Sequence, residues 1–205
     1  MKYPRNYGKV KELGPNLFHC VRGRQFDALT DGLHVAVIES YLNQDLASTP
    51  SGSYALARYE NSPTLQRMYS NAVAHGTAAL GAAPILKLGD RLTAVAYMFL
   101  ELGRAEGQAD RRKIDGKWKP LRRYNPALLR SCFKSMCGQL KQAYPDQELR
   151  IGLPRLYGGV AGLHFDHLVQ VLRPITSLYP EYKFFIFTSS TPDGSLVNPL
   201  PARIS

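Results

Sequence analysis

A glycine-rich segment, residues 157–162 (YGGVAG), is the first stretch whose residue types suit ligand binding. Gly158, Gly159 and Gly162 lack Cβ atoms, so several main-chain N–H groups can approach one anion there. A helix predicted to begin at Phe165 would add the partial positive charge of its N-terminus. The segment is no Walker A sequence, because no Gly-Lys-Ser/Thr follows, and it does not match Gly-x-Gly-x-x-Gly. Its spacing alone allows two interpretations, an ordinary strand-to-helix turn or a cradle for a phosphate group.

Polar residues gather in a second segment, residues 41–53, which has no hydrophobic period and is predicted to form a loop. The residues that could contact a ligand there are Asn43, Gln44, Asp45, Ser51, Gly52 and Ser53. Amide and carboxylate groups can hydrogen-bond ribose hydroxyls, and a Ser-Gly-Ser turn lets a ligand approach the main chain. Asn16, after the first predicted strand, could bond an exocyclic amine or cap a turn. A plain polar loop explains the composition of residues 41–53 equally well.

The basic segment of residues 104–123 holds eight Lys or Arg against three Asp or Glu, and so supplies +5 of the formal net charge of +10. Such a field attracts anionic partners such as nucleic acid, nucleotides or phosphorylated molecules. With Trp118 among the cations, the segment could hold nucleic acid by phosphate contacts and base stacking. The residues that would do so are Arg111, Arg112, Lys113, Lys117, Lys119, Arg122 and Arg123. A solvated loop is the competing interpretation.

Other kinds of chemistry find little support in the sequence. His164 and His167 have no third ligand at a matching spacing, so no metal site is predicted, although His164 could donate a proton or contact a phosphate. The three cysteines form no CxxC spacing and no nucleophile motif, which favours reduced thiols in the cytoplasm. No run of about 18 apolar residues and no apolar leader segment is present, so neither membrane insertion nor secretion is expected.

These segments need a scaffold, and the hydrophobic pattern predicts one. Strands are expected at residues 10–13, 33–40, 149–153 and 183–188, a hairpin at 83–88 and 92–100, and helices at 63–75, 128–144 and 165–178. The order strand, helix, strand over residues 149–188 predicts a parallel pair with a crossover helix, and the hairpin adds antiparallel pairing. The 205 residues are expected to form one domain, with a core at about 10–188, a basic loop at 104–123 and a tail at 192–205.

Taken in order, GPNLF, the loop with NQD and SGSYAL, the hairpin, the long helix and LPRLYGGVAGLHF resemble a macro domain, the ADP-ribose-binding fold, over about residues 10–188. The resemblance implies an α/β protein with three α/β/α layers and a central mixed sheet, with ADP-ribose as ligand and no cofactor. It places Asn16, Phe187 and Thr188 beside the adenine, and residues 43–53 around the distal ribose and diphosphate. It assigns the second diphosphate loop to Tyr157, Gly158, Gly159, Val160, Ala161 and Gly162.

The departures from the family pattern concern catalysis. Tyr157 replaces the usual first glycine and Gly158 the usual cysteine, and Ala161 stands where some ADP-ribosyl hydrolases carry a catalytic Asp. Asp45, or else His164, remains to orient or activate water near the distal ribose. The resemblance implies a hydrolase that removes ADP-ribose from a protein or nucleic acid, or phosphate from ADP-ribose-1''-phosphate. Two alternatives stay open: a non-catalytic reader of ADP-ribose, and a basic nucleic-acid-binding α/β protein.

Overall fold

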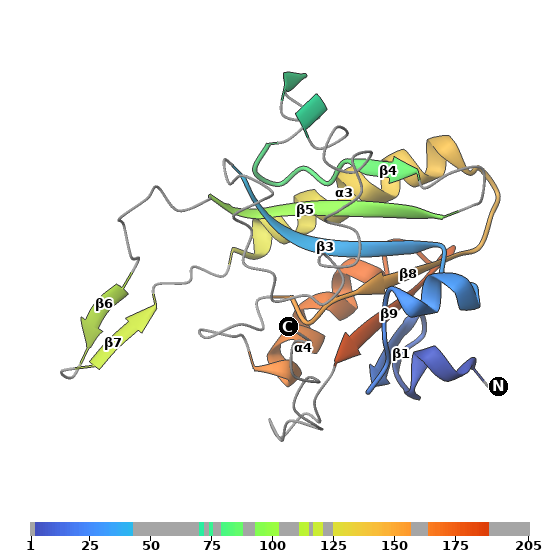
Figure 1. Ribbon diagram of the computed structural model, residues 1–205, viewed down its shortest axis with the longest axis horizontal. Coiled ribbons are helices and arrows are strands. Elements are labelled where there is room, and N and C mark those ends of the chain that lie inside the picture. Colours follow the sequence, from blue (N-terminus) through green and yellow to red (C-terminus); the bar gives the residue numbers. More distant parts are fainter. Residues whose placement is uncertain are drawn as a thin grey trace, which may run out of the picture.

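The computed structural model of the chain describes residues 3–42, 70–71, 74–75, 79–87, 93–102, 111–114, 117–120, 125–156 and 164–188. Its main element is a seven-stranded sheet in the order β1-β2-β9-β8-β3-β5-β4 (Figure 1). The strands of this sheet are β1 (Lys9–Gly14), β2 (Leu17–Val21), β3 (Val35–Leu42), β4 (Ile85–Lys87), β5 (Ala94–Leu102), β8 (Leu149–Leu153) and β9 (Tyr182–Thr188). A separate two-stranded hairpin consists of β6 (Arg111–Ile114) and β7 (Lys117–Pro120).

The main sheet is mixed. Its inner strands run parallel, because β2 pairs with β9, β9 with β8, β8 with β3, and β3 with β5 in that sense. The two outer strands are antiparallel to their neighbours, β1 to β2 and β4 to β5. The parallel strands all end at the same side of the sheet, which we call the carboxyl edge; the opposite side is the amino edge.

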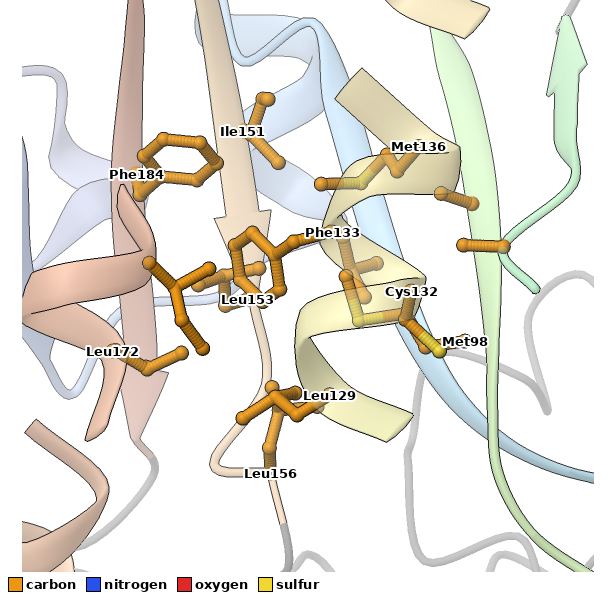
Figure 2. Packing of buried hydrophobic residues seen from close by; sticks show 14 of the residues in the cluster. Met98, Leu129, Cys132, Phe133, Met136, Ile151, Leu153, Leu156, Leu172 and Phe184 are labelled. Carbon is orange, nitrogen blue, oxygen red and sulfur yellow. The ribbon is translucent and has the colours of Figure 1, made fainter. Parts of the chain in front are cut away.

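Helices cover both faces of the sheet. They are α3 (Pro126–Ala143), α4 (Phe165–Thr176) and the short 3-10 helices η1 (Arg5–Tyr7) and η2 (Asp27–Asp31). α3 begins where the Asn125 side chain accepts hydrogen bonds from the N–H groups of Ala127 and Leu128. α3 and α4 bury their apolar sides in one cluster with the sheet. Figure 2 shows Phe133 of α3 pointing toward β8 and β9, and its ring centroid lies 5.6 Å from that of Phe184.

The 3-10 helices lie on the opposite face, over β2, β9 and β8. Tyr7 of η1 is fully buried there, with its ring centroid 5.1 Å from that of Phe185 and 5.7 Å from that of Phe187. Ala28 of η2 and Leu33 belong to the same apolar cluster. None of the helices in the described ranges combines the length and the hydropathy of a membrane span.

Most predicted elements are confirmed. The strands predicted at 149–153 and 183–188 are β8 and β9. They pair in parallel, and α4 connects them along the chain. The long predicted helix is α3, and the predicted hairpin at 83–100 is the antiparallel pair β4 and β5. The helix predicted at 63–75 lies mostly outside the described residues, and the tail at 192–205 lies wholly outside them.

Two features differ from the prediction. β2 was not expected, although its apolar run LFHCV directly follows a turn at Pro15 and Asn16. The sequence predicts a loop for segment 104–123, but residues 111–114 and 117–120 within it form the paired strands β6 and β7. An Asp-Gly pair, Asp115 and Gly116, separates the two strands in the sequence, and this dipeptide favours the tight turn of a hairpin.

Candidate functional site

The order of the strands reverses between β3 and β8, and this point is the centre of the candidate site. After β3, the chain continues to β4 and β5, which lie on one side of the β3–β8 pair. After β8, it continues to β9, which lies on the other side of that pair. In open α/β sheets, ligands bind at such a reversal, outside the carboxyl ends of the strands. The two segments nominated for ligand contacts follow these two strands in the sequence: residues 43–53 follow β3, and residues 157–162 follow β8.

Gln25 lies where the pairing of β3 with β8 ends. That ladder has only two residue pairs, Val35 with Ile151 and Ala36 with Gly152. Just beyond it, the buried Gln25 donates hydrogen bonds from Nε2 to the carbonyl oxygens of Val37, at 2.8 Å, and Gly152, at 2.9 Å. A buried carbonyl without a donor costs about 1–3 kcal/mol, so Gln25 stabilises both strands where their pairing stops.

Gly152 makes room for this contact. A Cβ at this position would lie 2.7 Å from Cδ2 of Leu33 and 3.0 Å from Cγ of Gln25. Only a residue without a side chain allows Gln25 to approach the main chain of β8 so closely. Gly152 and Gln25 together therefore hold β3 and β8 side by side just beyond the last residue pair of their ladder.

The carboxyl end of β2 supplies cationic side chains that sequence reasoning missed. Arg22 adopts a left-handed backbone conformation, with φ 60°, and its N–H donates to the carbonyl oxygen of Thr188 at 2.8 Å. Arg24 follows it, with Nη1 lying 3.6 Å from a carboxylate oxygen of Asp27. Both arginine side chains are exposed. The sequence signal for these residues is Arg-Gly-Arg directly after the apolar run LFHCV. This signal indicates a strand end only once LFHCV is recognised as a strand.

Phe187 and Thr188 end β9 at the carboxyl edge. Both side chains are almost wholly buried, with 6% and 5% exposure. The ring of Phe187 packs on Tyr7, while Oγ1 of Thr188 lies 2.8 Å from Nε2 of His19. Burial, with a smaller contribution from Lys11, lowers the pKa of His19 to about 4, so its ring is neutral at neutral pH. These side chains support the edge from within the fold.

Arg155 and His164 flank the glycine-rich segment. Arg155 follows β8, and its Nε is buried without a hydrogen-bond partner among the described residues. His164 precedes α4 without capping it, and its side chain is 78% exposed, with Nδ1 3.9 Å from Oδ2 of Asp166. An unpaired guanidinium N–H is a strong donor for an anionic acceptor, so Arg155 suits a phosphate that reaches this edge. In the described ranges, no three His, Cys, Asp or Glu side chains are grouped as metal ligands.

Asn16 lies at the amino edge, which corrects its predicted place beside the ligand. Because β2 follows it, Asn16 precedes a parallel strand instead of ending one. Its Nδ2 lies within hydrogen-bond distance of the carbonyl oxygens of Thr176 (2.8 Å), Tyr179 (3.0 Å) and Tyr182 (3.2 Å). The amide thus joins the β1–β2 turn to the connection between α4 and β9. A surface hollow of about 460 Å³ beside this turn is equally remote from the candidate site.

The remaining nominated residues lie outside the described residues. They are Asn43, Gln44, Asp45, Ser51, Gly52, Ser53, Tyr157, Gly158, Gly159, Val160, Ala161, Gly162, Arg122 and Arg123. Of the basic segment, the β6–β7 hairpin is described, and its register sets Arg112 opposite Lys119 and Lys113 opposite Trp118.

Comparison with solved structures supports the fold. The chain is similar to the macrodomain of Thermus aquaticus DarG, with a TM-score of 0.59 and 13% identity over 84% of this chain and 97% of that one. It is also similar to Thermosipho africanus DarTG in complex with ADP-ribose, with a TM-score of 0.60 and 12% identity over 87% of this chain and 43% of that one. For the macrodomain of Mycobacterium tuberculosis DarG, the TM-score is 0.56 and the identity 13%, over 83% and 98% of the two chains. The sequence matches no family model and no curated protein sequence.

Proposed function

We propose that this chain, which has the fold of a macro domain, binds ADP-ribose, free or attached to a macromolecule, at the carboxyl edge of its sheet. The observation that carries the proposal is the strand-order reversal between β3 and β8. The polar segment 43–53 and the glycine-rich segment 157–162 follow the two strands that flank this reversal. A structural neighbour, Thermosipho africanus DarTG, was solved with ADP-ribose, which supports the same ligand here.

The charges at this edge suit a diphosphate. Arg22 and Arg24 lie beyond the end of β2, and Arg155 lies beyond the end of β8. Within the described part of the chain, Asp27, beside Arg24, is the one carboxylate that forms an ion pair with these arginines. A diphosphate bound along the edge would provide acceptors for exposed guanidinium groups and for the unpaired Nε of Arg155. Main-chain N–H groups of the glycine-rich segment would complete the anion site.

Titration calorimetry with ADP-ribose tests the proposal, with AMP and ribose-5-phosphate as partial ligands. We expect ADP-ribose to bind more tightly than either fragment, because only the whole molecule spans both nominated segments. Arg155→Gln is expected to weaken binding by about tenfold, the usual effect of removing one charge-assisted hydrogen bond. Arg173→Gln makes the same charge change at the amino edge and should leave the affinity unchanged. Absence of any heat with millimolar ADP-ribose would exclude the proposal.

Hydrolysis of the ADP-ribosyl linkage is a second proposed activity, favoured by the exposed imidazole of His164 at the same edge. An exposed imidazole can accept a proton from water or donate one to a leaving group. Asp45, in the segment after β3, is the other proposed group. ADP-ribosylated protein, ADP-ribosylated nucleic acid and ADP-ribose-1''-phosphate are the substrates to assay. Loss of turnover with retained ADP-ribose binding in His164→Ala or Asp45→Ala would assign that residue to the reaction; binding without any turnover would leave a reader.

A further inference from the structure

The exposed side of α3 carries a line of basic residues. Its buried side consists of Leu129, Cys132, Phe133, Met136, Cys137 and Leu140. Arg130, Lys134 and Lys141 are all exposed, and at 100° per residue they fall within about 40° of one another around the helix axis. They extend over about 16 Å of helix length, at a rise of about 1.5 Å per residue. We call these three residues the α3 basic stripe.

The stripe carries positive charge without internal compensation. The sequence of α3, PALLRSCFKSMCGQLKQA, contains no Asp or Glu. Among the ion pairs between described residues, none involves Arg130, Lys134 or Lys141. Helices usually gain from carboxylates spaced three or four residues from a cation, and this one uses none. A repeated positive charge along one line fits a polymer of negative charges.

Gly138 lies beside the same stripe, between Lys134 and Lys141. It is exposed in the middle of α3, where a Gly costs about 0.5–1 kcal/mol relative to Ala. Packing does not require it, because a Cβ built at Gly138 has no atom of the described chain within 4 Å. A glycine in this position lets a partner approach the helix backbone closely. Such an approach would explain why α3 keeps a residue that lowers its stability.

The topology connects the stripe with the candidate site. β5 runs parallel to β3 and β8, so it ends at the carboxyl edge, while β8 begins at the amino edge. Since α3 connects the segment after β5 to the start of β8, it runs from the carboxyl edge toward the amino edge. The β6–β7 hairpin, with five Lys or Arg in its two strands, immediately precedes α3 along the chain. Arg130 is therefore the end of the stripe nearer to the candidate site.

We infer that the α3 basic stripe binds the phosphate backbone of a nucleic-acid strand. The occupant is a polyanion because phosphates repeat along it as the cations repeat along α3. A membrane surface fits less well, because an interfacial helix inserts its apolar side into lipid, and the apolar side of α3 is buried in the core. The large hydrophobic residues exposed in the described ranges, Leu80 and Leu178, both lie outside α3. This inference goes beyond the proposed function and does not depend on ADP-ribose binding.

Fluorescence anisotropy with a labelled, unmodified single-stranded oligonucleotide tests the inference on the full chain. We expect binding that weakens as salt rises from about 50 to about 200 mM. Lys134→Glu should weaken it by about three- to tenfold and reduce the salt slope, because at least one phosphate contact is lost. Lys11→Glu, at an exposed position on the outer strand β1, makes the same charge change and should have little effect. Equal effects of both variants would overturn the inference, because they would show only a response to net charge.

Gly138→Ala separates the surface from the stability of the fold. Alanine should raise the melting temperature by about 1–4 °C and weaken oligonucleotide binding at the same time. Higher stability with unchanged binding would contradict the close approach at Gly138. Equal binding to vesicles of anionic lipid would overturn the choice of nucleic acid as partner. ADP-ribose calorimetry on Lys134→Glu should match that of the unmodified protein, so failure of the proposed function and failure of this inference give different results.

Discussion

Nε2 of His19 lies 2.8 Å from Oγ1 of Thr188, which joins β2 to the last residue of β9 inside the fold. The His19 ring also packs against Phe165, the first residue of α4, with 4.3 Å between the ring centroids. One side chain therefore connects two adjacent parallel strands with the helix that follows the glycine-rich segment. His19 is 2% exposed, so the contact is shielded from water.

The first prediction is a loss of stability in acid caused by His19. Its pKa falls from 6.5 to about 4 on folding, so the native state disfavours the protonated ring. The contribution of this group is complete above pH 6.5 and is lost as the pH falls toward 4, by up to about 3 kcal/mol at about 1.4 kcal/mol per pKa unit. Urea denaturation at a series of pH values between 4 and 8 measures it.

His19→Gln provides the control for this pH dependence. The amide can still bond Thr188 but cannot titrate, so the loss between pH 6.5 and 4 should become smaller. Part of the loss of stability in acid should remain in this variant, because burial also lowers the pKa of His34. A pH dependence identical to that of the unmodified protein would show that His19 is not the group responsible.

The second prediction concerns Asn16, whose amide has acceptors on both sides of the connection between α4 and β9. Asn16→Ala should lower the free energy of unfolding by about 2–4 kcal/mol, because it leaves buried carbonyls without a donor. The affinity of the folded protein for ADP-ribose should not change, since Asn16 lies at the amino edge. Denaturation and calorimetry on the same variant measure both effects. Weaker ADP-ribose binding in fully folded protein would contradict the place that we assign to Asn16.

The third prediction concerns the thiols, all of which are buried. Burial raises the pKa of Cys20 and of Cys132 to about 12, and it raises that of Cys137 as well. Because the thiolate is the reactive form, a thiol reagent at pH 8 should modify none of them in the folded protein and all of them in denaturant. Rapid modification of one thiol under native conditions would show that its part of the core opens readily.

The sequence was sufficient to predict the elements with strong periodicity. α3 repeats its apolar residues on a helical period, and β8 and β9 are short, mostly apolar segments of strand length, each with one basic residue, so the hydrophobic pattern predicts their positions. The sequence does not predict β2, because the turn at Gly14 and Pro15 indicates the end of the first strand and gives no sign that a second strand follows. That turn instead forms a hairpin that reverses the chain, and the reversal moves Asn16 to the amino edge.

The candidate site was predictable only in part, for a similar reason. Strand order determines which connections meet, and nothing local in the sequence indicates that β3 and β8 become neighbours. Gln25 illustrates the limit, because its two acceptors lie 12 and 127 residues away along the chain. Residue types alone indicate the glycine-rich segment, and the family resemblance adds the diphosphate as its ligand, whereas Arg22, Arg24 and Gln25 required knowledge of where β2 ends.

The last prediction concerns Gln25, which we expect to position both nominated segments. In Gln25→Glu, an ionised carboxylate would face two carbonyl oxygens, so its pKa should rise above the unfolded value of about 4.3. The protonated acid can still donate one hydrogen bond. Stability should therefore be highest below pH 4.3 relative to the unmodified protein and be lost as the pH rises through the folded pKa, by about 1–3 kcal/mol.

Gln139→Glu is the matched control for this variant. Gln139 is a half-buried amide that also donates to a main-chain carbonyl distant in the sequence, from Nε2 to Ala83 at 3.0 Å, but it lies on α3. Both variants should lose stability at pH 8, as measured by urea denaturation. Only Gln25→Glu should weaken ADP-ribose binding, because only Gln25 bridges β3 and β8 where their pairing stops. If both variants bind ADP-ribose as the unmodified protein does, the reversal between these strands does not form the binding site.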